Sequence, residues 1–204
     1  MATEIELKLS IVGEHDKEAL IQVEKCLLSL GVDQRLHKNE LENAYFDTPD
    51  LRLNEERIAL RIRKKSDRYI QTLKTKGQSI NGLSKRGEWE WELDKPELNL
   101  VYLAQCDAWP KSVNADCLSK AFETNFTRHQ VEFTWEGARI ELALDRGEII
   151  SNGSCESINE LELELISGNE NDLHLLCREL QKYITLIPSD VSKAERGYCL
   201  GKMT

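Results

Sequence analysis

The chain has 204 residues, of which 40% are hydrophobic, and its formal net charge is −9 at pH 7. This length and composition fit one large globular domain with a substantial core. The acidic balance excludes a general nucleic-acid binder, which presents a basic surface or tail, and no apolar run is long enough to cross a membrane.

Six cysteines are scattered along the chain without a Cys-x-x-Cys pair: Cys26, Cys106, Cys117, Cys155, Cys177 and Cys199. This spacing indicates neither a zinc site nor a small disulfide framework. The charges of Glu4, Glu6 and Lys8 interrupt the region where a signal peptide needs an apolar stretch. We therefore expect a cytoplasmic protein with reduced thiols, no membrane segment and no nucleic-acid partner.

The first half of the chain is expected to contain strands, one helix and turns. Residues 4–9 alternate charged and apolar side chains, which is typical of a strand. Residues 14–30 carry apolar side chains at helical spacing up to Gly31 and predict an amphipathic helix. Further strands are expected at 42–46, 58–64, 69–76 and 88–93, with turns at 47–50 and 65–68 and a polar loop at 77–82. In the last of these strands, Trp89 and Trp91 are expected to belong to the core.

The second half is expected to be mainly strands, with a helix near the end. Residues 98–126 predict one or two helices, interrupted by Trp109-Pro110. Strands are expected at 130–135, 139–145, 148–151 and 160–166, with turns at Gly137 and at Arg146-Gly147. Residues 171–183 carry apolar side chains at helical spacing and predict a second amphipathic helix. No repeat or linker divides the sequence, so one domain over residues 1–204 is expected.

Like charges occur in pairs on one face of several predicted strands. Successive side chains of a strand point to opposite faces, so residues two apart share a face. The pairs are Glu4/Glu6, Arg61/Arg63, Lys74/Lys76 and Glu162/Glu164. Such neighbours repel unless a bound cation relieves the carboxylates and a bound polyanion relieves the basic groups.

Two folds satisfy this alternation. In one, an open antiparallel sheet packs its apolar face on helices and exposes its charged face to water. In the other, the sheet closes on itself, its apolar side chains point outward beneath the helices, and the charged side chains line a central tunnel. The alternation alone leaves both open.

An ordered series of motifs resembles the CYTH, or triphosphate tunnel metalloenzyme, superfamily over nearly the whole chain. The motifs are Glu4-x-Glu6-x-Lys8, Tyr45-Phe46-Asp47-Thr48-Pro49, Ala59-Leu60-Arg61-Ile62-Arg63, Leu73-Lys74, Leu144-Asp145-x-Gly147, Glu160-x-Glu162-x-Glu164 and Ser192-Lys193-x-x-Arg196-Gly197-Tyr198. The segment Gly82-Leu83-x-x-Arg86-x-Glu88 and Arg128 resemble the bacterial inorganic triphosphatase branch most closely.

This resemblance implies an α+β fold in which a closed antiparallel eight-stranded β-barrel forms a tunnel with flanking helices. It favours the inward-facing arrangement of the charges. Many bacterial relatives of this branch carry a second, helical CHAD domain after the tunnel domain. Because the sequence stops at Thr204, we expect a single CYTH-like tunnel domain and no C-terminal CHAD domain.

The resemblance also implies which residues form the site. The basic groups expected to bind the phosphates are Lys8, Arg61, Arg63, Lys74, Arg86, Arg128 and Lys193, of which the first four are also expected to be catalytic. The oxygen ligands expected for Mg²⁺ or Mn²⁺ are Glu4, Glu6, Glu162, Glu164 and Asp145. The four glutamates share one wall only if the first strand and the Glu162 strand are neighbours. For Asp145, a second role remains open, which is to orient a neighbouring arginine.

The implied reaction is metal-assisted attack of water on a terminal phosphorus of inorganic triphosphate, which gives diphosphate and phosphate. Alternatives within the superfamily are a class IV adenylyl cyclase, which makes cyclic AMP and diphosphate from ATP, and a thiamine triphosphatase. An alternative of another class is a non-catalytic module that binds nucleotides or polyphosphate. The expected partner is a small-molecule triphosphate, and the expected assembly is a monomer or homodimer.

Overall fold

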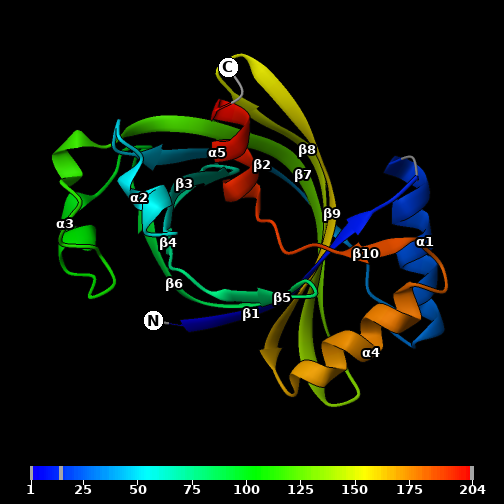
Figure 1. Cartoon of the computed structure of the whole chain (residues 1–204). Helices are drawn as coiled ribbons and strands as arrows, with labels where there is room; N and C mark the ends of the chain where they lie inside the picture. The colour runs from blue at the N-terminus through cyan, green and yellow to red at the C-terminus, as the bar shows by residue number, and fades with distance from the viewer. Residues whose placement is uncertain (1, 14–15, 203–204) are drawn as a thin grey trace.

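Eight strands close into an antiparallel barrel in the computed structural model, which describes residues 2–13 and 16–202 (Figure 1). Around the ring, the strands are β1 (Ala2–Ile11), β9 (Ser154–Ser167), β8 (Ala138–Ser151), β7 (Ser119–Trp135), β2 (His37–Asp47), β3 (Ala59–Lys65), β4 (Arg68–Lys74) and β6 (Leu83–Leu93). Pairing of β1 with β6 closes the ring. Two short strands extend the sheet, since β5 (Gln78–Ile80) pairs with β6 and β10 (Leu186–Pro188) pairs with β1. The expected closed eight-stranded barrel is confirmed.

Helices cover the barrel on two opposite sides and near one opening. Helices α1 (Asp16–Ser29) and α4 (Glu170–Leu180) lie together on one side, while α2 (Arg52–Glu55) and α3 (Leu100–Ala104) lie on the other (Figure 1). A 3-10 turn, η1 (Ala115–Cys117), precedes β7. Helix α5 (Lys193–Lys202) packs against β7, β8 and β9. Within the described ranges, no helix has the length and apolar character needed to cross a membrane.

The alternation of side chains along the strands produces two cores outside the barrel wall. Beneath α1 and α4, leucines of β1 and β9 such as Leu7 and Leu161 are at most 1% exposed. Beneath α2 and α3, Leu60 of β3 and Leu73 of β4 are fully buried. Each such burial contributes about 1.5–3 kcal/mol to stability. The outward residues therefore attach the helices, which leaves the alternate residues of each strand to face the tunnel.

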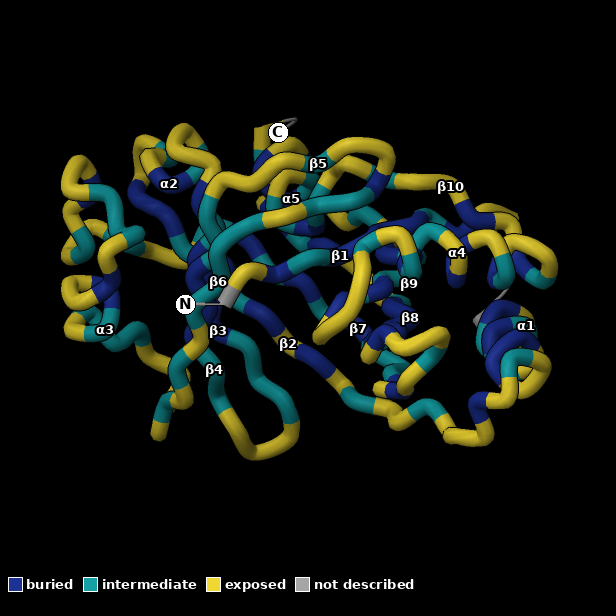
Figure 2. The backbone as a smooth tube through the Cα atoms, turned by 90° about the horizontal axis from the view of Figure 1, so that it is seen from below, coloured by how far each residue is buried: buried dark blue, intermediate teal, exposed yellow. Residues whose placement is uncertain are grey.

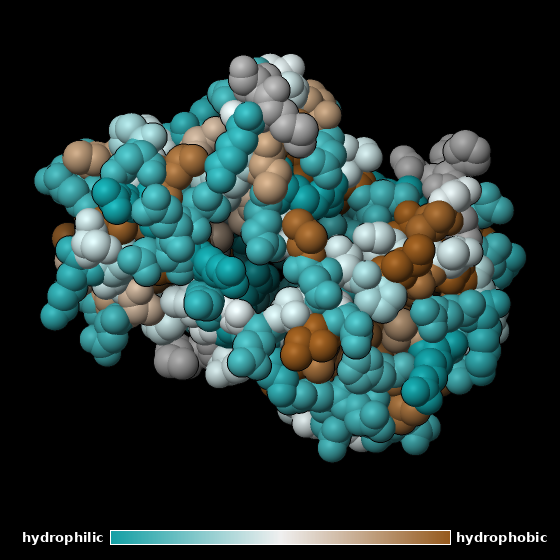
Figure 3. Space-filling model, in the orientation of Figure 1, coloured by the Kyte–Doolittle hydropathy of each residue, from teal (hydrophilic) through white to brown (hydrophobic). Residues whose placement is uncertain are grey.

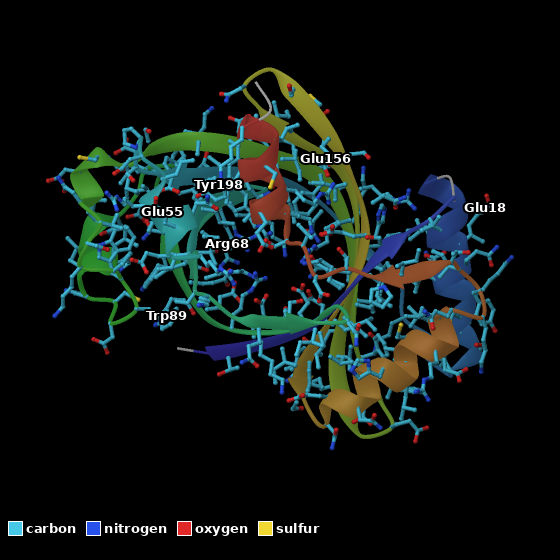
Figure 4. The ribbon with its side chains drawn as sticks, viewed as in Figure 1. Glu18, Glu55, Arg68, Trp89, Glu156 and Tyr198 are labelled. Carbon is cyan, nitrogen blue, oxygen red and sulfur yellow. The ribbon has the colours of Figure 1, made fainter. Side chains whose placement is uncertain are left out.

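The two tryptophans of β6 belong to the core on the α3 side. Trp89 and Trp91 both pack against the cluster that contains Leu103 of α3, and Trp91 stacks on Tyr102 with ring centroids 5.8 Å apart. Figure 4 places Trp89 between the barrel and α3. The expectation that these residues are core residues is confirmed, and their neighbours Glu88 and Glu90 line the tunnel.

A third core forms between α5 and the barrel. Tyr198 and Leu200 of α5 pack with Phe122 and Phe126 of β7, and the Phe122 and Tyr198 rings meet edge to face at 5.0 Å. This contact fixes α5 and with it Lys193, the first residue of the helix. In Figure 2, the barrel wall is mostly buried or intermediate, and the exposed segments gather in loops and strand ends.

Several predicted boundaries are wrong, most clearly the turn at Arg146-Gly147. Both residues lie within β8, where Gly147 pairs with Phe126 and Ile158. A Cβ at Gly147 would lie 2.1 Å from the Asn125 carbonyl oxygen, so the glycine permits a close approach of two strands and forms no turn. Strands β2, β6, β7 and β9 also start earlier than predicted.

Other differences concern short elements. The predicted polar loop at 77–82 contains β5, and the predicted helical region at 98–126 contains α3 and η1 but ends in β7. Helix α2, strand β10 and helix α5 were not predicted. The predicted start of the first helix at Glu14 lies outside the described residues, and α1 begins at Asp16.

The close packing of α5 on β7 yields a stability prediction. A Cβ at Gly197 would lie 2.3–2.7 Å from atoms of the Phe122 ring. We expect Gly197→Ala to lower the free energy of unfolding by about 1–3 kcal/mol in urea titrations, although alanine is the better helix former. The loss should shrink in a Phe122→Leu background, which makes space. A Gly197→Ala variant more stable than the parent would contradict this packing account.

Candidate active site

The inward side chains enclose a polar cavity of about 270 Å³ inside the barrel. It is hollowed into the face shown in Figure 3, where hydrophilic residues surround the central opening. Eleven of the twelve predicted site residues line it: Glu4, Glu6, Lys8, Arg61, Arg63, Lys74, Arg86, Arg128, Glu162, Glu164 and Lys193. Ten come from six different strands and Lys193 comes from α5, so only the closed barrel brings them together.

Strands β1 and β9 form the wall that the sequence motifs required. They pair in antiparallel register with Glu6 opposite Glu164 and Lys8 opposite Glu162. The condition for a shared acidic wall, that these two strands are neighbours, is therefore met. Glu4 lies further along β1, opposite Arg86 of β6.

Glu4 of this wall is paired with basic residues of two other strands. Its carboxylate accepts a hydrogen bond of 2.6 Å from Lys74 Nζ and another of 2.6 Å from Arg86 Nε. Lys74 also contacts Glu88 Oε1 at 3.0 Å. Burial raises the pKa of Glu4, but the charges of Lys74 and Arg86 outweigh it and lower the pKa to about 2.

A second ion-paired group centres on Asp145, which is fully buried. Arg128 binds both of its oxygens, with Nε to Oδ1 at 2.7 Å and Nη2 to Oδ2 at 2.6 Å, and also contacts Glu162 at 2.5 Å. Lys193 Nζ contacts Asp145 at 2.7 Å, Glu162 at 2.8 Å, and Glu160. Asp145 thus orients an arginine, the second of its two expected roles.

The acids of this second group have the spacing of a metal site. Ligand oxygens of Asp145, Glu160 and Glu162 all lie within 4.8 Å of one another. The ammonium group of Lys193 contacts all three carboxylates and so supplies the positive charge there. Although burial raises the pKa of Glu162, Lys193 and Arg128 hold it well below its usual range. A role of Asp145 as a metal ligand stays a prediction.

Three of the predicted basic residues lack a carboxylate partner in the described part of the chain. Among the described residues, no ion pair within 4.0 Å involves Lys8, Arg61 or Arg63. Lys8 and Arg61 are only 5% and 9% exposed, and Arg61 Nε is buried without a hydrogen-bond partner. Glu88 and Glu90 attract Arg61 from beyond ion-pair distance. Burial, followed by repulsion from Arg61 and Arg128, lowers the pKa of Arg63 to about 9.

Two of the predicted carboxylates lack a close positively charged partner. Glu6 is 5% exposed, and its ion-pair contact is with Arg86 Nη2 at 4.0 Å. Within the described part of the chain, Glu164 makes no ion pair. Burial, together with repulsion from Glu162 and Glu4, raises the pKa of Glu6 to about 7, and burial and repulsion from Glu4 do the same for Glu164. One cavity therefore holds acids that lack a cation and bases that lack an anion.

Several residues of the site were not predicted. Tyr45, Glu88, Glu90, Gln130 and Glu141 also line the cavity. The alternation contained the signal for three of them, because Glu88 and Glu90 share a face of β6 with Arg86, and Glu141 alternates with the apolar Ile140 and Leu142, which are buried on the other face. Asn43, which contacts Arg63, gave no signal because an isolated asparagine carries no charge pattern.

The raised pKa of Glu6 predicts how stability depends on pH without metal. Because the folded pKa of about 7 exceeds the ordinary value of 4.5, the stability that Glu6 contributes is lost as pH rises from 4.5 through 7. We expect Glu6→Gln to raise the free energy of unfolding at pH 8, by about 2–3 kcal/mol at most, and to change it little at pH 5.

The measurement is urea unfolding in EDTA at both pH values. Glu18→Gln serves as the control, because Glu18 is exposed on the outer side of α1 (Figure 4). An equal effect of Glu6→Gln at pH 5 and pH 8 would show that the Glu6 carboxylate is not destabilised by burial.

Comparison with known proteins supports the sequence motifs. The model of the CYTH domain matches residues 2–198. An inorganic triphosphatase of Haemophilus influenzae is 34% identical over 206 aligned residues, which cover 98% of this chain and 56% of the relative. The chain therefore spans little more than half the length of this curated relative.

Solved structures show the same fold. A Hippeastrum protein with a dominant triphosphatase activity superposes with a TM-score of 0.66 at 21% identity, covering 96% of this chain and 95% of its own. A Pyrococcus horikoshii protein gives 0.60 at 19% identity, covering 94% and 97%. With the family model matched over nearly its whole length, this chain belongs to the CYTH domain family.

Proposed function

We propose that this protein hydrolyses inorganic triphosphate to diphosphate and phosphate inside the tunnel, with Mg²⁺ or Mn²⁺ as cofactor. The observation that carries the proposal is that the cavity holds unpaired charges of both signs. Among the described residues, Lys8, Arg61, Arg63 and Glu164 form no ion pair, and Glu6 has only the 4.0 Å contact with Arg86. A complex of a divalent cation with a linear triphosphate supplies both charges at once.

The donor set fits a hard divalent cation. Glu4, Glu6, Glu162 and Glu164 would hold it through carboxylate oxygens, which Mg²⁺ and Mn²⁺ prefer, and no histidine or cysteine lines the described cavity. When bound, such an ion supplies Lewis-acid neutralisation of phosphate charge. Glu4 and Glu162 are ionised by their basic neighbours and are ready to bind a cation.

The basic residues bind and orient the phosphates. Arg61 and Arg63 would grip phosphate oxygens with planar forks, while Lys8 and Lys74 would act as point charges. The same groups would stabilise the charge on the phosphoryl oxygens as water attacks a terminal phosphorus and diphosphate leaves. Arg86, Arg128 and Lys193 would complete the positive lining from positions that their acidic partners fix.

The relatives support the same activity. The Haemophilus influenzae relative is an inorganic triphosphatase, and the Hippeastrum protein has a dominant triphosphatase activity. The further proposals are that these residues form one tunnel domain and that the protein is a monomer or homodimer in the cytoplasm. All six cysteines lie in the described residues and are free, which agrees with a reducing compartment.

The test of function uses purified protein with tripolyphosphate, ATP or thiamine triphosphate, each with Mg²⁺, Mn²⁺ or EDTA, and identifies every product. We expect phosphate and diphosphate from tripolyphosphate in the presence of either metal, and no turnover in EDTA. Cyclic AMP as the main product from ATP would identify a cyclase instead. Absence of turnover with every substrate and metal would leave a binding module.

Arg61 provides the sharpest substitution test of the site. We expect Arg61→Ala to lower kcat/KM for tripolyphosphate about a hundredfold or more, because it removes one buried cation from the charged transition state. The matched control is Arg68→Ala, since Arg68 is exposed outside the cavity and paired with Glu92. Near-parental activity of a folded Arg61→Ala variant would remove Arg61 from the mechanism.

A further inference from the structure

The inward basic residues differ in whether a neighbouring strand places an acid in register with them. Four of them have such an acid on one side: Lys8 with Glu162, Arg86 with Glu4, Lys74 with Glu88, and Arg128 with Asp145. Arg61 and Arg63 have none, since β4 places Thr72 and Ile70 in register with them. Between β2 and β3 the registered pairs are Asn43 with Arg63 and Tyr45 with Arg61. Among the described residues, the two cavity-lining arginines without ion pairs are thus those that face an amide and a phenol on β2.

Asn43 is held so that its carbonyl faces Arg63. The residue is 2% exposed, and its Nδ2 donates to the Thr124 carbonyl oxygen at 2.9 Å. Its Oδ1 accepts a hydrogen bond from Arg63 Nε at 2.8 Å. Because Nε is occupied, the two terminal nitrogens of the guanidinium remain for a ligand. The Phe126 ring lies 6.0 Å from Arg63 Cζ and adds a cation–π contact.

Tyr45 fixes Arg61 in a similar way. Its ring is 4% exposed and stacks on Phe122 with centroids 4.5 Å apart, and Phe122 in turn meets Tyr198 of α5. Tyr45 is in register with Arg61, and against the effect of burial the positive charge of Arg61 lowers the pKa of the Tyr45 hydroxyl. Tyr45 also lines the cavity, so its hydroxyl stands at the edge of the space that a ligand would fill.

We propose that Asn43 and Tyr45 are positioning residues, which fix the guanidinium groups of Arg63 and Arg61 without neutralising them. The inference rests on the proposed function, because it assigns these two arginines to the phosphates. The pair Arg128–Asp145 shows the alternative, in which a registered carboxylate binds Nε and Nη2 of the guanidinium and offsets its charge. The β2–β3 wall thereby keeps its positive charge for a polyanion.

A change of Asn43 to aspartate separates charge from shape. Asn43→Asp keeps the size and the acceptor facing Arg63 but adds a negative charge in register with this arginine. We expect it to raise KM for tripolyphosphate at least tenfold with a thermal midpoint no lower than that of Asn43→Ala, because the new carboxylate competes with phosphate. Asn43→Ala, which frees the arginine, should instead lower kcat more than it raises KM.

The controls separate the possible failures. Asn125→Asp makes the same chemical change on the outer face of neighbouring β7 and should leave KM unchanged. Tyr45→Phe keeps the stacked ring and should raise KM about threefold or more, which tests the second residue if Asn43→Asp does not fold. A folded Asn43→Asp variant with the parental KM, or a Tyr45→Phe variant with the parental KM if Asn43→Asp is unfolded, would overturn the inference. Absence of tripolyphosphate turnover in the parent protein would instead overturn the proposed function.

Discussion

The structure depends on one constraint, which is that charges enclosed by a β-barrel lose water and must find opposite charges. Most inward residues obey it within the protein. Glu4 is held by Lys74 and Arg86, and Asp145 by Arg128 and Lys193. Of the predicted residues, Lys8, Arg61, Arg63 and Glu164 form no ion pair in the described chain, and Glu6 has only the 4.0 Å contact with Arg86, so unpaired charges of both signs remain. A site that binds a cation and a polyanion together requires such unpaired charges, held in place by neighbouring residues that are ion-paired.

The fold creates this situation through the two faces of each strand. Outward leucines attach α1, α4, α2 and α3, so every strand must direct its charged face into the ring. Helix α5 closes the arrangement by packing on Phe122 and bringing Lys193 to the carboxylates of β8 and β9. Stability and site formation are therefore two consequences of one alternation.

The sequence was sufficient to predict which side chains share a face of a strand, but not which side chains of other strands they contact. Residues two apart in β1, β3 and β9 had to share a face, and the family motifs indicated the inward one; eleven of twelve predicted residues line the cavity. Partners depend on register between distant strands, so the roles of Asp145 and Asn43 could not be derived from spacing. Gly147 was misread because a close approach of strands and a turn both select glycine. Helix α5 was missed because its burial is supplied by β7, β8 and β9 rather than by a strong apolar stripe.

The most direct test of the central claim is a crystal structure with Mn²⁺ and a non-hydrolysable triphosphate analogue, with the metal located by its anomalous signal. The account predicts a Mn²⁺ peak among Glu4, Glu6, Glu162 and Glu164, and phosphates in contact with Lys8, Arg61 and Arg63. The account would be contradicted if the metal and the analogue bound only outside the barrel and the charged side chains of the tunnel kept the same contacts as in the unbound protein.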